Sequence, residues 1–225
     1  MRNVLAIAAR VVAVGLLLTS TITAKTDDFE PFGLPTVPAS TGVFTVIWRN
    51  LQVQTQFDMK IISRCRALGA RCLSPEAKKL ISIIDDGANS DGIARIAHIN
   101  LAVNAALRPS NDNSSVAWLS PLAVLARGRG DCKHYAVVKY AALSEIGINL
   151  DDLRIVITEK IGQRENHALV AVRNDGRWLI LDNLTSVLTE SSQVIDRYRP
   201  MYLLDHNGVR QYGNRVATNV TTCHS

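Results

Sequence analysis

The fold of this chain is decided by the segment HALVAVRNDGRWLILD at residues 167–182. Two short stretches rich in leucine and β-branched residues flank the turn sequence Asn174-Asp175-Gly176. Such a turn between two stretches of this kind predicts a tight β-hairpin. The segment therefore predicts two antiparallel strands, at 167–173 and 178–182. Further strands of the same sheet are predicted at 153–159 and 201–204.

The chain before this sheet is predicted to be mainly helical over residues 43–107. Ser74-Pro75 is a typical helix start, because serine caps the first turn and proline is tolerated within it. A later helix is expected to carry Asn100 and Asn104 on an otherwise apolar face, where buried amides usually fix neighbouring loops by hydrogen bonds. Helices followed by antiparallel strands indicate an α+β domain. Two more helices are predicted, at 121–127 and 132–146.

The first 24 residues have the layout of a secretory signal peptide. Arg2 and Arg10 supply positive charge, residues 11–18 are almost entirely apolar, and small or polar residues lead to Ala24. We expect cleavage after Ala24 and a periplasmic or secreted mature protein; an uncleaved N-terminal anchor is the alternative. No later segment is long and apolar enough to cross a bilayer, so stable membrane insertion is not expected after signal removal.

The mature chain is expected to have an extended arm at 25–41, which is rich in proline, and one domain at 42–225. The formal charge of +5 falls to +3 when Arg2 and Arg10 leave with the signal peptide. Neither a run of basic residues nor an interleaved aromatic platform accompanies this small surplus, so nucleic acid is not an expected partner. We expect a monomer.

The four cysteines allow a disulfide in an exported protein. Cys65 and Cys72 are seven residues apart and can close a short loop around Gly69. We favour a Cys65–Cys72 bridge and a free Cys132, because a Cys132–Cys223 bond would consume the only attractive nucleophile. The state of Cys223 is left open.

Cys132 follows Asp131, a residue that can cap the start of a helix. The positive potential at a helix N-terminus stabilises a thiolate and lowers the pKa of the thiol. Gly128 and Gly130 allow close approach of the backbone, whose N–H groups can contribute an oxyanion hole. Taken alone, Cys132 is more often a buried structural cysteine.

The predicted hairpin brings His167 and Asp182 together. If the turn is Asn174-Asp175, His167 lies opposite Asp182; if it is Asp175-Gly176, Asp182 is the diagonal neighbour of His167 on the same face. Either register lets the carboxylate orient the imidazole. We therefore predict Cys132 as nucleophile, His167 as base and Asp182 as orienting carboxylate.

Other uses of these residue types are less favoured. His134 is two residues from Cys132 on a helix, so the two side chains point in different directions. Cys132-Lys133-His134 does not have a zinc-ligand spacing, and no second pair of ligands supports it. We expect no cofactor.

Three blocks of sequence together resemble the bacterial transglutaminase-like cysteine proteinases, which include LapG-type periplasmic cysteine proteases. The blocks are GRGDCKHYAVVKY at 128–140, NHALVAV at 166–172 and WLILDNL at 178–184. The resemblance extends over about residues 43–205 and includes the Cys65/Cys72 pair. It implies a papain-like or transglutaminase-like fold, a triad of Cys132, His167 and Asp182, and periplasmic proteolysis, with surface adhesins among the substrates of better-understood relatives.

One departure concerns calcium. LapG-type relatives often carry acidic residues after the nucleophile, which bind calcium together with the preceding aspartate. Here only Asp131 matches, and Lys133 and His134 stand at the acidic positions. A hard dication prefers oxygen ligands, so we expect neither a metal site nor calcium dependence, and the adhesin-processing role is weakened.

Three functions remain open on the sequence. The first is an exported cysteine endopeptidase that cleaves a cell-surface or periplasmic protein through an acyl-enzyme on Cys132. The second is a transglutaminase-type or amidase-type acyl transferase on the same triad, and the third is a non-catalytic periplasmic binding module. We favour the endopeptidase, and we expect the segments 108–118 and 160–166 to border its cleft.

Overall fold

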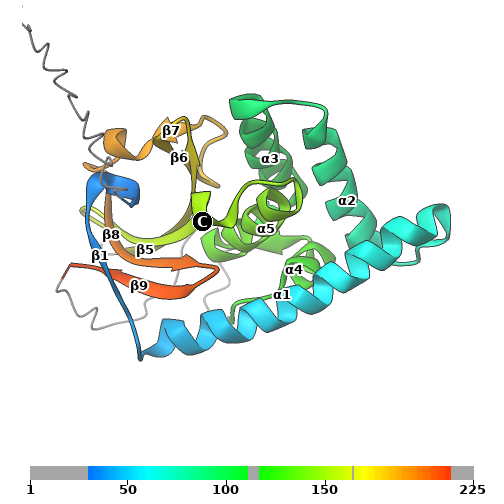
Figure 1. The fold of residues 1–225 in the computed structure, drawn as a ribbon, viewed down its shortest axis with the longest axis horizontal. Coiled ribbons are helices and arrows are strands. Elements are labelled where there is room, and N and C mark those ends of the chain that lie inside the picture. Colours follow the sequence, from blue (N-terminus) through cyan, green and yellow to red (C-terminus); the bar gives the residue numbers. More distant parts are fainter. Residues whose placement is uncertain (1–29, 111–116, 164, 214–225) are drawn as a thin grey trace, which may run out of the picture.

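The computed structural model describes residues 30–110, 117–163 and 165–213. The expected signal peptide at 1–24 and Cys223 lie outside these ranges. Helices form one side of the molecule and a curved sheet forms the other, with α5 between them against the sheet (Figure 1). The α+β arrangement predicted from the order of helices and strands is thus confirmed.

The helical layer matches the predicted segments closely. Ser74 caps α2, since its Oγ accepts the N–H of Ala77 at 3.1 Å. The α-helices are α1 (Val43–Leu68), α2 (Pro75–Ala88), α3 (Gly92–Ala106), α4 (Pro121–Arg127) and α5 (Cys132–Glu145). Short 3-10 turns are η1 (Pro31–Gly33), η2 (Gly69–Arg71), η3 (Leu150–Asp152) and η4 (Ser191–Gln193).

The main sheet is antiparallel, with strand order β1-β9-β8-β4-β5-β6-β7. The four predicted strands are its centre, and the structure adds β1 and β9 at one edge and β7 at the other. The strands are β1 (Thr36–Pro38), β4 (Leu153–Lys160), β5 (Glu165–Asn174), β6 (Arg177–Leu181), β7 (Thr189–Glu190), β8 (Tyr198–Asp205) and β9 (Gly208–Tyr212).

The β5–β6 hairpin adopts the second of the two registers considered above. Asn174 pairs with Arg177, so the turn residues are Asp175 and Gly176. Both have positive φ, 50° and 74°, as a two-residue turn of type I′ requires. The register places Asp182 just beyond the end of β6, diagonal to His167.

A β-bulge interrupts the pairing of β8 with β4. Ile157 pairs with Tyr202 but Thr158 pairs with Pro200, so Met201 is the extra residue. Because side chains alternate between the two faces of a strand, one extra residue reverses the faces of everything before it in β8. Tyr198 therefore packs in the same cluster as Leu203, an odd number of residues away.

Two apolar clusters cover the two faces of the sheet. The larger joins the helices, including α5, to the side chains of Ile155, Val170 and their neighbours on one face. The smaller lies on the other face and contains Phe32 of η1 and Tyr198 of β8. Sequestering both faces from water fixes the register of β5, the strand that carries His167.

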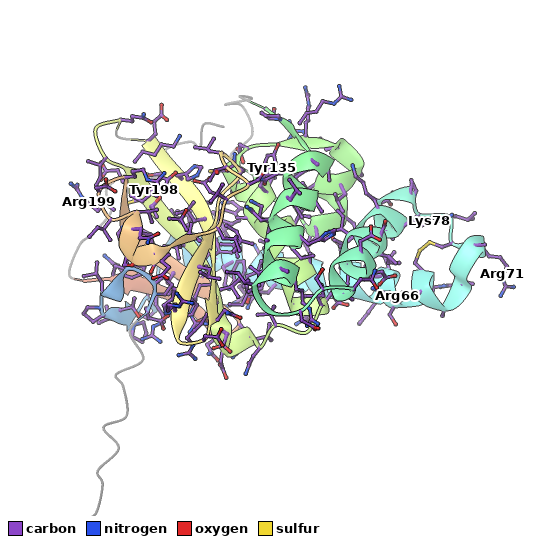
Figure 2. All side chains as sticks on the ribbon, turned by 90° about the horizontal axis from the view of Figure 1, so that it is seen from above. Arg66, Arg71, Lys78, Tyr135, Tyr198 and Arg199 are labelled. Carbon is purple, nitrogen blue, oxygen red and sulfur yellow. A yellow bond between two sulfur atoms is a disulfide. The ribbon has the colours of Figure 1, made fainter. Side chains whose placement is uncertain are left out.

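The predicted disulfide is present at the far end of the helical layer. Cys65 and Cys72 are bonded, with their Cα atoms 4.9 Å apart, and they tie the end of α1 to the start of α2. Figure 2 shows this bond near the labelled Arg66, Arg71 and Lys78, on the side of the molecule opposite Tyr198 and Arg199. This disulfide therefore joins two helices at a position remote from His167.

Among the described residues, the helices are too short or too polar to traverse a lipid bilayer.

Candidate active site

Cys132 occupies the first position of α5, where the sequence placed it. Gly128 ends α4 in a left-handed conformation (φ 66°), and Asp131 is the N-cap of α5. Gly130 permits the backbone just before α5 to lie close to the first turn of that helix, since an added Cβ would lie 2.5 Å from the Cβ of His134. The thiol position is thus at the positive end of the helix dipole.

Pairing of two short strands holds the preceding loop against this turn. β2 (Arg108–Pro109) runs parallel to β3 (Arg129–Gly130), and the N–H of Ser110 donates to Gly130 O at 2.9 Å. The sequence predicted that the segment 108–118 borders the cleft but gave no sign of this pairing, because a two-residue bridge leaves no periodic signal. This contact brings the start of the 108–118 segment next to the nucleophile turn.

The expectation of a free Cys132 thiol is corrected by the structure. Cys132 is disulfide-bonded, and the described residues contain no free cysteine. The sequence argument kept Cys132 free because the chemistry needs a thiol, which is an argument from function and not from geometry. Cys223, the remaining cysteine of the chain, lies outside the described residues.

His167 and Asp182 form the buried pair predicted from the hairpin. His167 Nε2 lies 2.8 Å from Asp182 Oδ1, and His167 has no exposed surface. His167 Nδ1 has no hydrogen-bond partner among the described residues. With Nε2 engaged by the carboxylate, Nδ1 is the ring nitrogen available for proton exchange.

A backbone contact joins the nucleophile helix to the strand that carries the histidine. The N–H of Ala168, the residue after His167, donates to Cys132 Sγ at 3.2 Å. This hydrogen bond lies between α5 and β5, which pack against each other. The hydrogen bond therefore places the Cys132 sulfur beside the backbone of the residue next to His167, and Cys132, His167 and Asp182 are all buried.

Asp182 is held by more partners than the sequence indicated. Its Oδ1 also accepts the N–H of Leu184 at 3.0 Å, and its Oδ2 accepts the hydroxyl of Tyr198 at 2.6 Å. Burial alone would raise the pKa of Asp182, but the hydrogen bonds from His167, Tyr198 and Leu184 lower it to about 2. The carboxylate is therefore ionised throughout the neutral range.

Tyr198 is a site residue that sequence reasoning missed. Its ring stacks on the imidazole of His167, with centroids 5.4 Å apart and planes 10° from parallel. The predicted strand began only at residue 201, and Tyr198 reaches the site because of the bulge at Met201. No local sequence signal announces that bulge.

The two asparagines of α3 perform the role predicted for them. Asn104 Nδ2 donates to the backbone oxygen of Asp182 at 3.0 Å and to that of Thr185 at 3.2 Å. Asn100 Nδ2 donates to the same Thr185 oxygen at 3.2 Å. These bonds fix the loop that follows β6 and so fix the backbone of Asp182.

Lys139 of α5 is a second residue that the sequence did not single out. It is almost completely buried, and its Nζ has no hydrogen-bond partner among the described residues. Burial lowers its pKa to about 7, against the opposing attraction of Asp182. Lys139 is therefore a buried ionisable group on which the charge of Asp182 acts.

Asp131 is enclosed by two nitrogen groups. The ammonium of Lys133 contacts Asp131 Oδ2, and His134 Nδ1 lies 2.8 Å from Oδ1. Burial opposes ionisation, but His134 and Lys133 outweigh it and lower the pKa of the Asp131 carboxyl. Both carboxylate oxygens thus face nitrogen groups. Within the described residues, no cluster of three or more acidic, histidine or cysteine side chains suits a metal ion.

Comparison with solved structures identifies the fold. LapG of Legionella pneumophila is 23% identical to this chain with a TM-score of 0.56, and the match covers 68% of this chain and 87% of LapG. The calcium-bound form of that protein gives 21% identity and a TM-score of 0.57, covering 72% of this chain and 93% of LapG. An EGTA-treated form gives 22% identity and a TM-score of 0.58, covering 71% and 88%.

Comparison with curated proteins gives no match. The model of one protein family, the bacterial transglutaminase-like cysteine proteinases, matches residues 54–201. That range contains Cys132, His167 and Asp182 and spans most of the described helices and strands. The transglutaminase-like fold expected from the three sequence blocks is confirmed, and the chain belongs to the bacterial transglutaminase-like cysteine proteinase family.

Proposed function

We propose that this chain is an exported cysteine endopeptidase that cleaves protein substrates through an acyl-enzyme on Cys132. The observation that carries the proposal is the buried His167–Asp182 pair at 2.8 Å, beside a cysteine at the first position of a helix. Membership of a cysteine proteinase family supports the same chemistry. A binding module would have no need of an oriented imidazole with one unengaged nitrogen.

The reaction follows from the roles of these groups. In the reduced enzyme, His167 takes the proton of the Cys132 thiol, and the thiolate attacks the scissile carbonyl carbon. The backbone N–H groups at the start of α5 can stabilise the resulting oxyanion. The imidazolium then protonates the leaving amine, which departs and leaves a thioester. Water, deprotonated by His167, hydrolyses the thioester and restores the thiol.

Asp182 has an orienting role in this scheme. Its carboxylate engages Nε2, so Nδ1 is directed to the proton exchange, and its negative charge stabilises the imidazolium. A substrate in the periplasm or on the cell surface fits the signal-like layout of residues 1–24. A large surface adhesin belongs to this class of substrate.

Identification of cleaved termini tests the proposal directly. Cells that produce the wild-type protein and cells that produce Cys132→Ala are compared for new protein N-termini in the periplasm and at the surface. We expect a small set of termini that occurs only with the wild-type protein. Products joined to an added amine, with no hydrolysed product, would instead establish an acyl transferase.

We predict that activity does not depend on calcium. Lys133 contacts Asp131 and His134 lies beside it, so a dication would have to displace an ammonium from the carboxylate. Cleavage of a casein substrate by the reduced enzyme is expected to be unchanged by excess EGTA. Loss of cleavage in EGTA and its recovery on addition of calcium would contradict this prediction.

A further inference from the structure

We propose that Tyr198 is a positioning residue for the triad, whose hydroxyl fixes the Asp182 carboxylate and whose ring fixes the plane of His167. The inference rests on the proposed function, because it assigns Tyr198 a role in the same reaction. Tyr198 donates to Asp182 and stacks on His167, so its effect is exerted through these two residues.

The hydroxyl of Tyr198 holds the Asp182 carboxylate. Asp182 Oδ1 is shared between His167 Nε2 and the Leu184 N–H, whereas Oδ2 accepts the hydroxyl of Tyr198 at 2.6 Å. A buried carboxylate oxygen without a donor is costly, so this bond holds the carboxylate in one rotamer. The rotamer held is the one that presents Oδ1 to the histidine.

The ring of Tyr198 holds the plane of the His167 imidazole. It lies nearly parallel to the imidazole at a centroid distance of 5.4 Å, and both side chains are buried. A histidine ring can rotate about its terminal torsion, which is broad. A flat aromatic surface against one side of the imidazole opposes that rotation and so keeps Nδ1 on the side opposite the Nε2–Asp182 contact.

The β-bulge at Met201 sets the direction of the Tyr198 side chain. Without the extra residue Met201, Tyr198 would point to the opposite face of the sheet, because one residue reverses side-chain direction in a strand. Bulges of this kind re-aim side chains beside functional sites. Pro200 lies next to the bulge and has no N–H to donate to β4, which suits an irregular position.

The environment of the pair contains few other ionisable groups. Lys139 of α5 interacts electrostatically with Asp182, and Arg197 lies with its guanidinium 6.0 Å from the centre of the Tyr198 ring. Burial and the negative charge of Asp182 raise the pKa of Tyr198, so its hydroxyl stays protonated and remains a donor at neutral pH. At neutral pH the protonated hydroxyl of Tyr198 therefore donates to the ionised carboxylate of Asp182.

The decisive experiment compares Tyr198→Phe with Tyr198→Ala in the reduced enzyme, measuring kcat/KM for peptide hydrolysis against pH. Tyr198→Phe keeps the stacked ring and removes only the hydroxyl, and a loss of about 10-fold in kcat/KM is expected. Tyr198→Ala removes both contacts and is expected to lose about 100-fold. The losses should fall mainly on kcat.

The pH profile provides a readout that a purely structural residue would not change. Removal of the hydroxyl takes a donor from ionised Asp182 and raises its pKa, so the acid limb of kcat/KM moves to higher pH in Tyr198→Phe. The alkaline limb is expected to stay in place. An acid limb and a rate equal to those of the wild-type enzyme would overturn the inference.

Two other residues of the sheet, Tyr212 and Arg199, provide matched controls for the Tyr198 variants. Tyr212 is also buried, and its hydroxyl donates to the backbone oxygen of Pro31 at 3.1 Å, away from the triad. Tyr212→Phe therefore measures the general cost of losing a buried tyrosine hydroxyl. Arg199→Ala removes an exposed ion pair with Glu159 one residue from Tyr198. Both variants are expected to retain the wild-type pH profile.

Alkylation separates this inference from the proposed function. The rate at which iodoacetamide modifies Cys132 in the reduced protein reports thiolate formation without any substrate. If the wild-type protein hydrolyses no peptide but Tyr198→Phe still shifts the acid limb of alkylation, the proposed function fails and the positioning role stands. If hydrolysis is normal and neither acid limb shifts, only the positioning role fails.

Folding of the variants is checked by urea denaturation. Tyr198→Phe retains the ring and its packing in the smaller apolar cluster, so a cooperative transition is expected. Should Tyr198→Ala fail to fold, Tyr198→Phe still decides the role of the hydroxyl. The role of the ring is then tested with Tyr198→Leu, which fills the space but offers no flat surface to the imidazole.

Discussion

Replacement of Cys132 by alanine is expected to abolish peptide hydrolysis, with a loss of about 10⁴-fold or more in kcat. The sulfur forms the covalent intermediate, and no other group at the first position of α5 can replace it. His167→Ala is expected to be similarly inactive, because the proton of the thiol then has no acceptor. Asp182→Asn retains the shape of the site and is expected to keep more activity than either.

The measurement is hydrolysis of a casein or fluorogenic peptide substrate by each purified, reduced variant. Cys65→Ser/Cys72→Ser, which removes the remote disulfide, is the control for the loss of cysteines in general. It is expected to lower the urea midpoint and leave the activity of the folded protein unchanged. Hydrolysis by Cys132→Ala at the wild-type rate would show that another nucleophile acts.

The oxidised protein is expected to be inactive and to gain full activity on reduction. Cys132 is disulfide-bonded in the structure, and a sulfur in a disulfide has no thiolate with which to attack a carbonyl. For the same reason iodoacetamide is expected not to modify Cys132 before reduction, since only a thiolate is alkylated. Addition of dithiothreitol is expected to restore both substrate hydrolysis and the alkylation of Cys132.

Cysteine variants test which disulfide bond makes the oxidised protein inactive. Cys65 and Cys72 bond to each other, and Cys223 is the one other cysteine of the sequence. Cys223→Ser is therefore expected to be active without reductant, whereas Cys65→Ser/Cys72→Ser still requires it. The prediction is wrong if unreduced wild-type protein hydrolyses substrate as fast as reduced protein does.

Much of the site was accessible to sequence reasoning because its parts are local. Asp131 lies at a helix start, where short polar side chains occur because the backbone N–H groups there need partners. Asp175-Gly176 determines a two-residue turn, and the hairpin register then places Asp182 near His167. Each of these inferences needs only residues that are close in the chain.

The rest of the site depends on contacts between distant segments. The bulge at Met201 sets the face of Tyr198, and it arises only where β8 pairs with β4, some forty residues earlier. The burial of Lys139 depends on what packs around α5, because the same helix sequence on a surface would leave its ammonium in water. Neither feature has a periodic or compositional signature.

The sequence alone predicted the order of helices and strands, favoured the Cys65–Cys72 bridge and singled out the three residues of the proposed triad. The elements and the triad residues follow from local periodicity, turn chemistry and helix capping, which act over a few residues, and the bridge from the short spacing of its two cysteines. Only the tertiary structure decided how the Asp182 carboxylate is held, since its donors come from β5, the loop after β6 and β8. Hydrogen bonds between such distant segments form only when the sheet has its final register, so no stretch of sequence by itself encodes them.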